Sequence, residues 1–166
     1  MSVIDDVLKA NDAYAQQFTF GHLLMPPSRK LAIVACMDAR MTVEQMLGLH
    51  TGEAHIIRNA GGIVTEDALR SLLISHYLLG TQEFMVINHT DCGMLTFRDE
   101  ELRARLQRTS GTAVVTPAHF YAFSDVVNNV RQQLQKVRSH PWMPQQVPAR
   151  GFVYDVKTGK LTEVAN

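Results

Sequence analysis

The chain has 166 residues, and its sixteen basic residues balance sixteen acidic ones at an isoelectric point near 7.1. This length fits one domain spanning residues 1–166, which buries about 70% of its unfolded surface and needs no disulfide or structural metal merely to fold. The balanced charge argues against a nucleic-acid partner, and no apolar run is long enough to cross a membrane. Because no apolar signal core opens the sequence, we expect a cytoplasmic protein whose two cysteines serve a metal or catalysis rather than a disulfide.

Residues 2–18 have the apolar spacing of an amphipathic helix, and residues 21–30, with two adjacent prolines, form a connector. Short apolar runs then alternate with helical patterns. The expected strands are 31–35, 54–57, 84–87 and 152–156, with a hairpin turn at 157–160 leading to an edge strand at 161–164. The expected helices are 42–47, 65–79, 98–108 and 124–138. Because strands separated by helices run parallel, we predict an α/β fold with a mainly parallel four-stranded sheet, a short antiparallel edge strand and helices on both faces.

The two cysteines lie in segments that favour metal binding. Cys36 directly follows the first expected strand, and Cys92 lies three residues after His89, at the end of the third. Two thiolates and an imidazole suit zinc, and three protein ligands leave a fourth position open for chemistry. A helix beginning near Thr90 would place Cys92 at its positive end and favour the thiolate. The alternative is that Cys36 is a buried core residue and His89 a polar strand end.

Asp38 and Arg40 lie two residues apart at the mouth of the first expected strand. A guanidinium beside a carboxylate holds it ionised and oriented. Asp38 then has two possible roles: it accepts a hydrogen bond from a zinc-bound water, or it fills the fourth zinc position itself. The alternative is an ordinary surface ion pair.

Residues 58–62, with the sequence RNAGG, follow the second expected strand. Gly61 and Gly62 would let backbone amides approach a small substrate, and Arg58 could steady an anion or a subunit contact. The alternative is an ordinary turn between a strand and a helix.

Three segments together closely resemble the beta-class carbonic anhydrases in sequence, order and spacing. They are residues 36–40 (CMDAR), 58–62 (RNAGG) and 89–94 (HTDCGM). The resemblance extends to residues 151–155, so it covers nearly the whole chain, and the short length is similar to the compact branch of that class.

The resemblance implies a zinc ion bound by Cys36, His89 and Cys92, and a dyad of Asp38 with Arg40. The implied reaction is attack of zinc-bound hydroxide on CO₂, giving bicarbonate and a proton, with a closed state in which Asp38 replaces the water. It also implies a dimer or tetramer in which the N-terminal helix, residues 2–18, packs on a partner subunit.

Two other functions remain open at this point. Relatives of the same fold hydrolyse carbonyl sulfide or carbon disulfide, which are linear and isoelectronic with CO₂, so the same zinc site would serve them. The third hypothesis is a zinc-stabilised binding module without catalysis, in which Asp38 would be the fourth ligand of a structural zinc.

Overall fold

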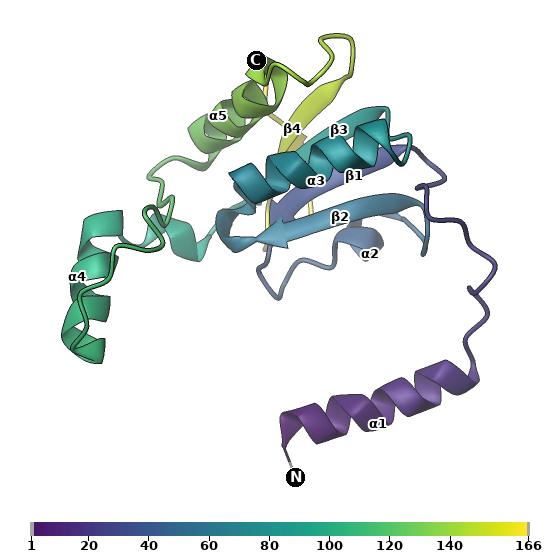
Figure 1. Cartoon of the computed structure of the whole chain (residues 1–166), viewed down its shortest axis with the longest axis horizontal. Coiled ribbons are helices and arrows are strands. Elements are labelled where there is room, and N and C mark those ends of the chain that lie inside the picture. Colours follow the sequence, from purple (N-terminus) through teal and green to yellow (C-terminus); the bar gives the residue numbers. More distant parts are fainter. Residues whose placement is uncertain (1, 166) are drawn as a thin grey trace.

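Within residues 2–165, which the computed structural model describes, five strands form one sheet in the order β2-β1-β3-β4-β5 (Figure 1). The strands are β1 (Leu31–Cys36), β2 (Ala54–Asn59), β3 (Glu83–His89), β4 (Ala149–Tyr154) and β5 (Leu161–Glu163). The first four run parallel, and β5 pairs antiparallel with β4. The predicted mainly parallel sheet with an antiparallel edge strand is therefore confirmed.

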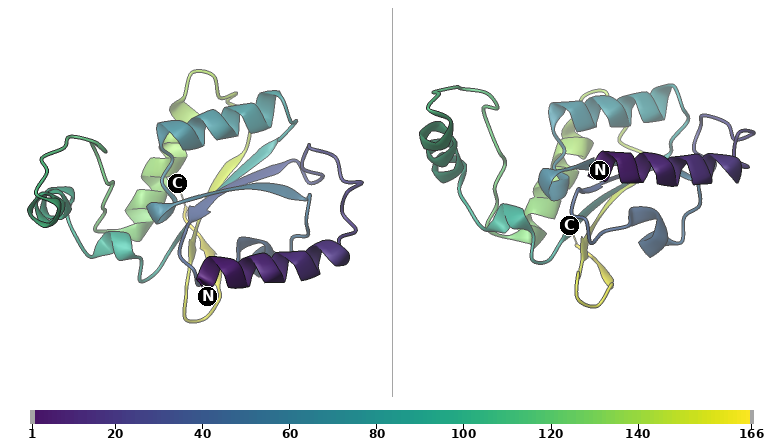
Figure 2. Two further views of the ribbon diagram at one scale, coloured as in Figure 1. Left: turned by 60° about the horizontal axis from the view of Figure 1, so that its bottom comes forward. Right: turned by 90° about the horizontal axis from the view of Figure 1, so that it is seen from below.

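Helices cover both faces of this sheet, as expected from the sequence (Figure 2). The helices are α1 (Val3–Gln16), α2 (Val43–Leu47), α3 (Glu66–Tyr77), α4 (Asp99–Ser110) and α5 (Val126–Ser139), with short 3₁₀ turns η1 (Ala60–Gly62) and η2 (Gly93–Leu95). An apolar core lies between the sheet and α3 and α5, and a second core lies between the opposite face and α2. No helix among residues 2–165 is long and apolar enough to span a membrane.

The apolar sequence of β1 reflects its central place in the sheet. Strands of a parallel sheet are covered on both faces, so their sequences read as continuous apolar runs. Residues 32–36 of β1 are all buried, although successive side chains point to opposite faces. In β3, Val86 packs in the core under α3 and α5, whereas Ile87 packs in the core under α2.

β4 differs most from its predicted bounds, since it begins at Ala149 rather than 152 and ends at Tyr154 rather than 156. Its end has a local cause. The carboxylate of Asp155 accepts hydrogen bonds from the backbone amides of Lys157 and Thr158. Such an aspartate turn competes with continued strand pairing, so β4 ends at Tyr154, before its predicted end at residue 156.

The N-terminal helix α1 lies apart from the sheet and its covering helices (Figure 1). Ser2 caps it and Asp5 completes a capping box, so its start is well defined. None of its residues is buried, and its apolar side chains remain exposed. They are Val3, Ile4, Val7, Leu8 and Tyr14. We call residues 2–18 the N-terminal arm.

Gly151 in β4 should be intolerant of a side chain. A Cβ atom there would lie 2.3 Å from Val130 Cγ1 and 2.7 Å from Leu134 Cδ1, so α5 packs directly on this glycine. We expect Gly151→Ala to destabilise the protein by about 1–3 kcal/mol through overpacking. Thermal unfolding followed by circular dichroism should show a melting temperature lower by about 2–4 °C per kcal/mol.

Gly21→Ala is the matched control, because its Cβ would meet only Phe18 at 3.8 Å and the backbone there is not left-handed. Its melting temperature should equal that of the wild type. Equal melting temperatures for Gly151→Ala and the wild type would show that α5 can move away from β4 without cost.

Candidate metal centre

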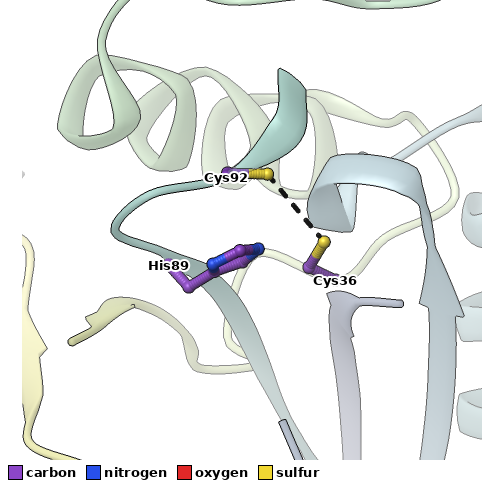
Figure 3. Close-up of side chains that lie close together, drawn as sticks. All are labelled: Cys36, His89 and Cys92. Carbon is purple, nitrogen blue, oxygen red and sulfur yellow. Dashed lines mark hydrogen bonds between the residues drawn. The ribbon is translucent and has the colours of Figure 1, made fainter. Parts of the chain in front are cut away.

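The sheet brings Cys36, His89 and Cys92 together although they are distant in sequence. β1 and β3 are adjacent and parallel, so Cys36, the last residue of β1, and His89, the last residue of β3, meet at one edge of the sheet. The candidate ligand atoms of the three side chains all lie within 4.8 Å of one another (Figure 3). The two sulfur atoms are 4.0 Å apart, and all three residues are buried.

The imidazole of His89 is oriented for a metal. Its Nδ1 lies 2.8 Å from the carbonyl oxygen of Thr90, so this nitrogen carries the proton and donates. The other ring nitrogen, Nε2, then directs its lone pair toward the two sulfur atoms. Among the buried side-chain nitrogen and oxygen atoms of residues 2–165, Nε2 alone lacks a hydrogen-bond partner. Because such a buried polar atom is costly to leave unpaired, the two sulfur atoms and Nε2 fit a zinc ion with one open position.

Cys36 and Cys92 have opposite pKa shifts, so that Cys36 loses its proton more readily. The hydrogen bond from Cys92 lowers the pKa of Cys36 to about 4, although burial raises it. The nearby side chain of His89 and the backbone amides of Asp38 and Gly61 lower this pKa further. The same hydrogen bond, together with burial, raises the pKa of Cys92. Cys36 is therefore a thiolate at neutral pH, the form of cysteine that binds metals.

No helix begins near Thr90, so the condition for placing Cys92 at the positive end of a helix is not met. The segment from His89 to Cys92 instead contains Asp91 in the left-handed region, with φ of 54°, and only the three-residue turn η2 follows Cys92. A helix dipole therefore does not explain the chemistry of Cys92. What brings its sulfur back toward His89 is this left-handed turn, which aspartate tolerates better than most residues.

Asp38 and Arg40 form a bidentate ion pair beside the three candidate ligands. Arg40 Nε donates to Asp38 Oδ1 at 2.9 Å, and Nη2 donates to Oδ2 at 2.8 Å. These bonds hold the pKa of Asp38 well below its usual range. Asp38 Oδ2 lies 3.6 Å from His89 Nε2, so the carboxylate faces the centre rather than the solvent.

Asp91 belongs to the same cluster and was missed by the sequence reasoning. Arg40 Nη1 donates to its carboxylate at 2.8 Å, and Nη2 donates to its carbonyl oxygen at 2.9 Å. Arg40 thus joins the loop after β1 to the loop between His89 and Cys92. The available signal was only the place of Asp91 between two candidate ligands.

Arg58 contacts the main chain next to the candidate ligands. It lies in β2, and its guanidinium donates to the carbonyl oxygens of Cys36 at 2.9 Å and of Asp38 at 2.7 Å. Two hydrogen bonds to the main chain fix the loop that carries Asp38. Arg58 therefore has a supporting role in the geometry of the centre.

A largely apolar cavity of about 510 Å³ is lined by two of the candidate ligands, Cys36 and Cys92, and by Asp38. Gly61 lines it, but Gly62 does not; Gly62 is buried against the backbone of Cys36 and Ile87. The other lining residues include Met37, Ala39, Ala60, Met94 and Phe97. The cavity suits a small substrate without charge.

Comparison with known proteins agrees with this geometry. The carbonic anhydrase family model matches residues 31–161. Beta-carbonic anhydrase 1 of Mycobacterium tuberculosis (strain ATCC 25618 / H37Rv) is 50% identical over 164 residues, covering 99% of both chains. Carbon disulfide hydrolase of Acidianus sp. (strain A1-3) is 36% identical, covering 95% of this chain and 87% of the relative.

The solved structures give the same result. Carbonic anhydrase from Streptococcus mutans superposes with a TM-score of 0.94 at 42% identity, covering 99% of both chains. The apo form of a carbon disulfide hydrolase superposes with a TM-score of 0.72 at 34% identity, covering 98% of this chain and 90% of that one. The chain therefore belongs to the beta-carbonic anhydrase family.

Proposed function

We propose that the protein binds one zinc ion through Cys36, His89 and Cys92 and catalyses the reversible hydration of CO₂ to bicarbonate and a proton. The observation that carries this proposal is the unpartnered Nε2 of His89, buried with two sulfur atoms beside an apolar cavity. When bound, zinc lowers the pKa of a water molecule and so supplies a nucleophile at neutral pH. The high identity to a beta-carbonic anhydrase over the whole chain supports the same reaction.

The side chains around the centre have separate tasks in this proposal. Asp38 is ionised and faces the three candidate ligands, so it would accept a hydrogen bond from the nucleophile there and orient it. Arg40 prevents the carboxylate from turning to solvent, since two of its nitrogen atoms hold the two Asp38 oxygens. In a closed state, Asp38 itself takes the fourth position. The cavity next to Gly61 holds the uncharged substrate against Met94 and Phe97.

The metal assignment predicts about one zinc per chain, measured by elemental analysis of purified protein. Cys36→Ser and Cys92→Ser should each bind zinc far more weakly, because serine does not supply a thiolate at neutral pH. Cobalt loading of the wild type should add a thiolate-to-cobalt absorption band, which each serine variant should weaken. Full zinc content and an unchanged band in Cys36→Ser would exclude this ligand set.

The catalytic role of Asp38 predicts that Asp38→Asn lowers the rate of CO₂ hydration by about 10²–10⁴-fold, because a neutral amide is a weaker hydrogen-bond acceptor than a carboxylate and also presents a donor. Zinc content should stay at the wild-type level, as measured on the same sample. Asp67→Asn is the control, since it removes only an exposed ion pair with Arg70 on α3. An Asp38→Asn protein that hydrates CO₂ at the wild-type rate would exclude this role of Asp38.

Hydrolysis of carbonyl sulfide or carbon disulfide is the second candidate function, favoured by the relatives that hydrolyse carbon disulfide. The apolar cavity accepts any of these linear molecules. The decisive experiment measures kcat/KM for CO₂, carbonyl sulfide and carbon disulfide on one zinc-loaded preparation. We expect CO₂ to have the highest value. Sulfide release with an efficiency equal to or above CO₂ hydration would assign the protein to the second function instead.

We propose further that residues 1–166 form one domain whose N-terminal arm packs on a second copy of the chain, in a dimer or tetramer. The exposed apolar side of α1 supports this, because an amphipathic helix gains its stability from burying that side. Val7→Asp, in the middle of the apolar side, should shift the full-length protein toward monomer in size-exclusion chromatography with light scattering. Gln16→Glu, on the opposite side of α1, should leave the mass unchanged. An unchanged mass for Val7→Asp would contradict the packing of the arm.

A further inference from the structure

Three buried amide side chains connect helix α5 with the candidate metal centre. Asn88 lies on β3, next to His89 but on the opposite face of the strand, and Asn129 and Gln133 lie one turn apart on α5. Their exposed fractions are 1%, 4% and 2%. Amides are seldom buried this completely unless every polar atom has a partner.

The hydrogen bonds of these amides run in one direction. Gln133 Nε2 donates to Asn129 Oδ1 at 2.8 Å, and Asn129 Nδ2 donates to Asn88 Oδ1 at 2.7 Å. Asn88 Nδ2 then donates to the carbonyl oxygens of Gly61 at 2.9 Å and Gly62 at 3.2 Å. If any one of these amide groups were rotated by 180°, its NH₂ group would face another N–H donor. The orientation of each side-chain amide therefore fixes that of its neighbour.

The other end of the series is fixed as well. Gln133 Oε1 accepts from the backbone amide of Val64 at 3.0 Å and from Lys136 Nζ at 3.1 Å. Val64 follows the Gly61–Gly62 turn by two residues. The three amides therefore bind the chain before and after Ile63. Asn88 binds the carbonyl oxygens of Gly61 and Gly62, and Gln133 binds the backbone amide of Val64.

The turn lies directly against a candidate zinc ligand. Gly61 and Gly62 have φ of 82° and 61°, in the left-handed region that favours glycine. A Cβ atom on Gly62 would lie 3.0 Å from the backbone nitrogen of Cys36 and 2.8 Å from Asn88 Nδ2. Gly61 forms part of the cavity wall beside Cys36. A shift of the turn would therefore move both the ligand and the wall.

We propose that Asn88, Asn129 and Gln133 are positioning residues, which hold the Gly61–Gly62 turn against Cys36 and so keep the metal-binding geometry and the cavity wall in place. This inference rests on the zinc site proposed above. Apolar side chains would fill the same space and pack equally well, but they would not fix two carbonyl oxygens of an irregular turn.

The test compares Asn129→Ala with Ser75→Ala. Ser75 is also a buried polar residue with two partners, His55 Nδ1 at 2.7 Å and Thr81 Oγ1 at 2.6 Å, but it lies toward the opposite edge of the sheet. Both variants should lower the melting temperature, since each leaves buried polar atoms unpaired. Only Asn129→Ala should weaken cobalt binding, by about 10–100-fold in competition with a chelator, and alter the thiolate-to-cobalt absorption band.

An Asn129→Ala protein with wild-type cobalt affinity and an unchanged band would overturn the proposal, leaving the amides with a purely structural role. If Asn129→Ala does not fold, Gln133→Met is the second test, because it preserves side-chain volume while removing the hydrogen bonds to Asn129 and Val64. Weakened cobalt binding by Gln133→Met would support the proposal, and wild-type affinity would overturn it. Wild-type protein that binds cobalt but hydrates no CO₂ when zinc-loaded would instead refute the proposed function alone.

Discussion

The parallel pairing of β1 with β3 is the constraint on which the candidate centre depends. The two strands are in register from Leu31 opposite Glu83 to Ala35 opposite Ile87, so their carboxyl ends lie together. In open α/β sheets this edge is where ligands bind. The buried apolar residues of the strands supply most of the free energy that stabilises the sheet. The polar side chains at its edge are not needed for that stability. The fold thus supplies a stable platform, and the loops at its edge supply the chemistry.

Arginine side chains connect these loops to one another. Arg58 of β2 holds the backbone after β1, and Arg40 joins that same loop to the segment between His89 and Cys92. The planar guanidinium makes several directed hydrogen bonds at once, which lysine would not reproduce. The amides of Asn88 and its partners act on the third loop, between β2 and α3. Each loop at this edge therefore has a side-chain tie of its own.

The sequence allowed the fold and the principal side chains to be predicted, because both leave local signals. A continuous apolar run marks a strand buried on both faces, and cysteine or histidine at its end marks a candidate ligand. The supporting residues leave no such signal. Asn129 and Gln133 read as the polar side of a helix, and only the packing of α5 on β3 shows that they are buried. The hydrogen bonds of Arg58 to the loop after β1 likewise depend on the pairing of β2 beside β1, which the sequence does not show.

The hydrogen bond between His89 Nδ1 and the carbonyl of Thr90 has a consequence for proton balance. It is made to the next residue in the chain, so Nδ1 keeps its proton and Nε2 faces the two sulfur atoms with or without a metal. The pKa of Cys92 is raised, and so is the pKa of His89, where burial is outweighed by the negative charges of Cys36 and Asp38 and by the hydrogen bond to Thr90. A metal must displace the protons that these two groups hold, so metal uptake should release protons and strengthen as the pH rises.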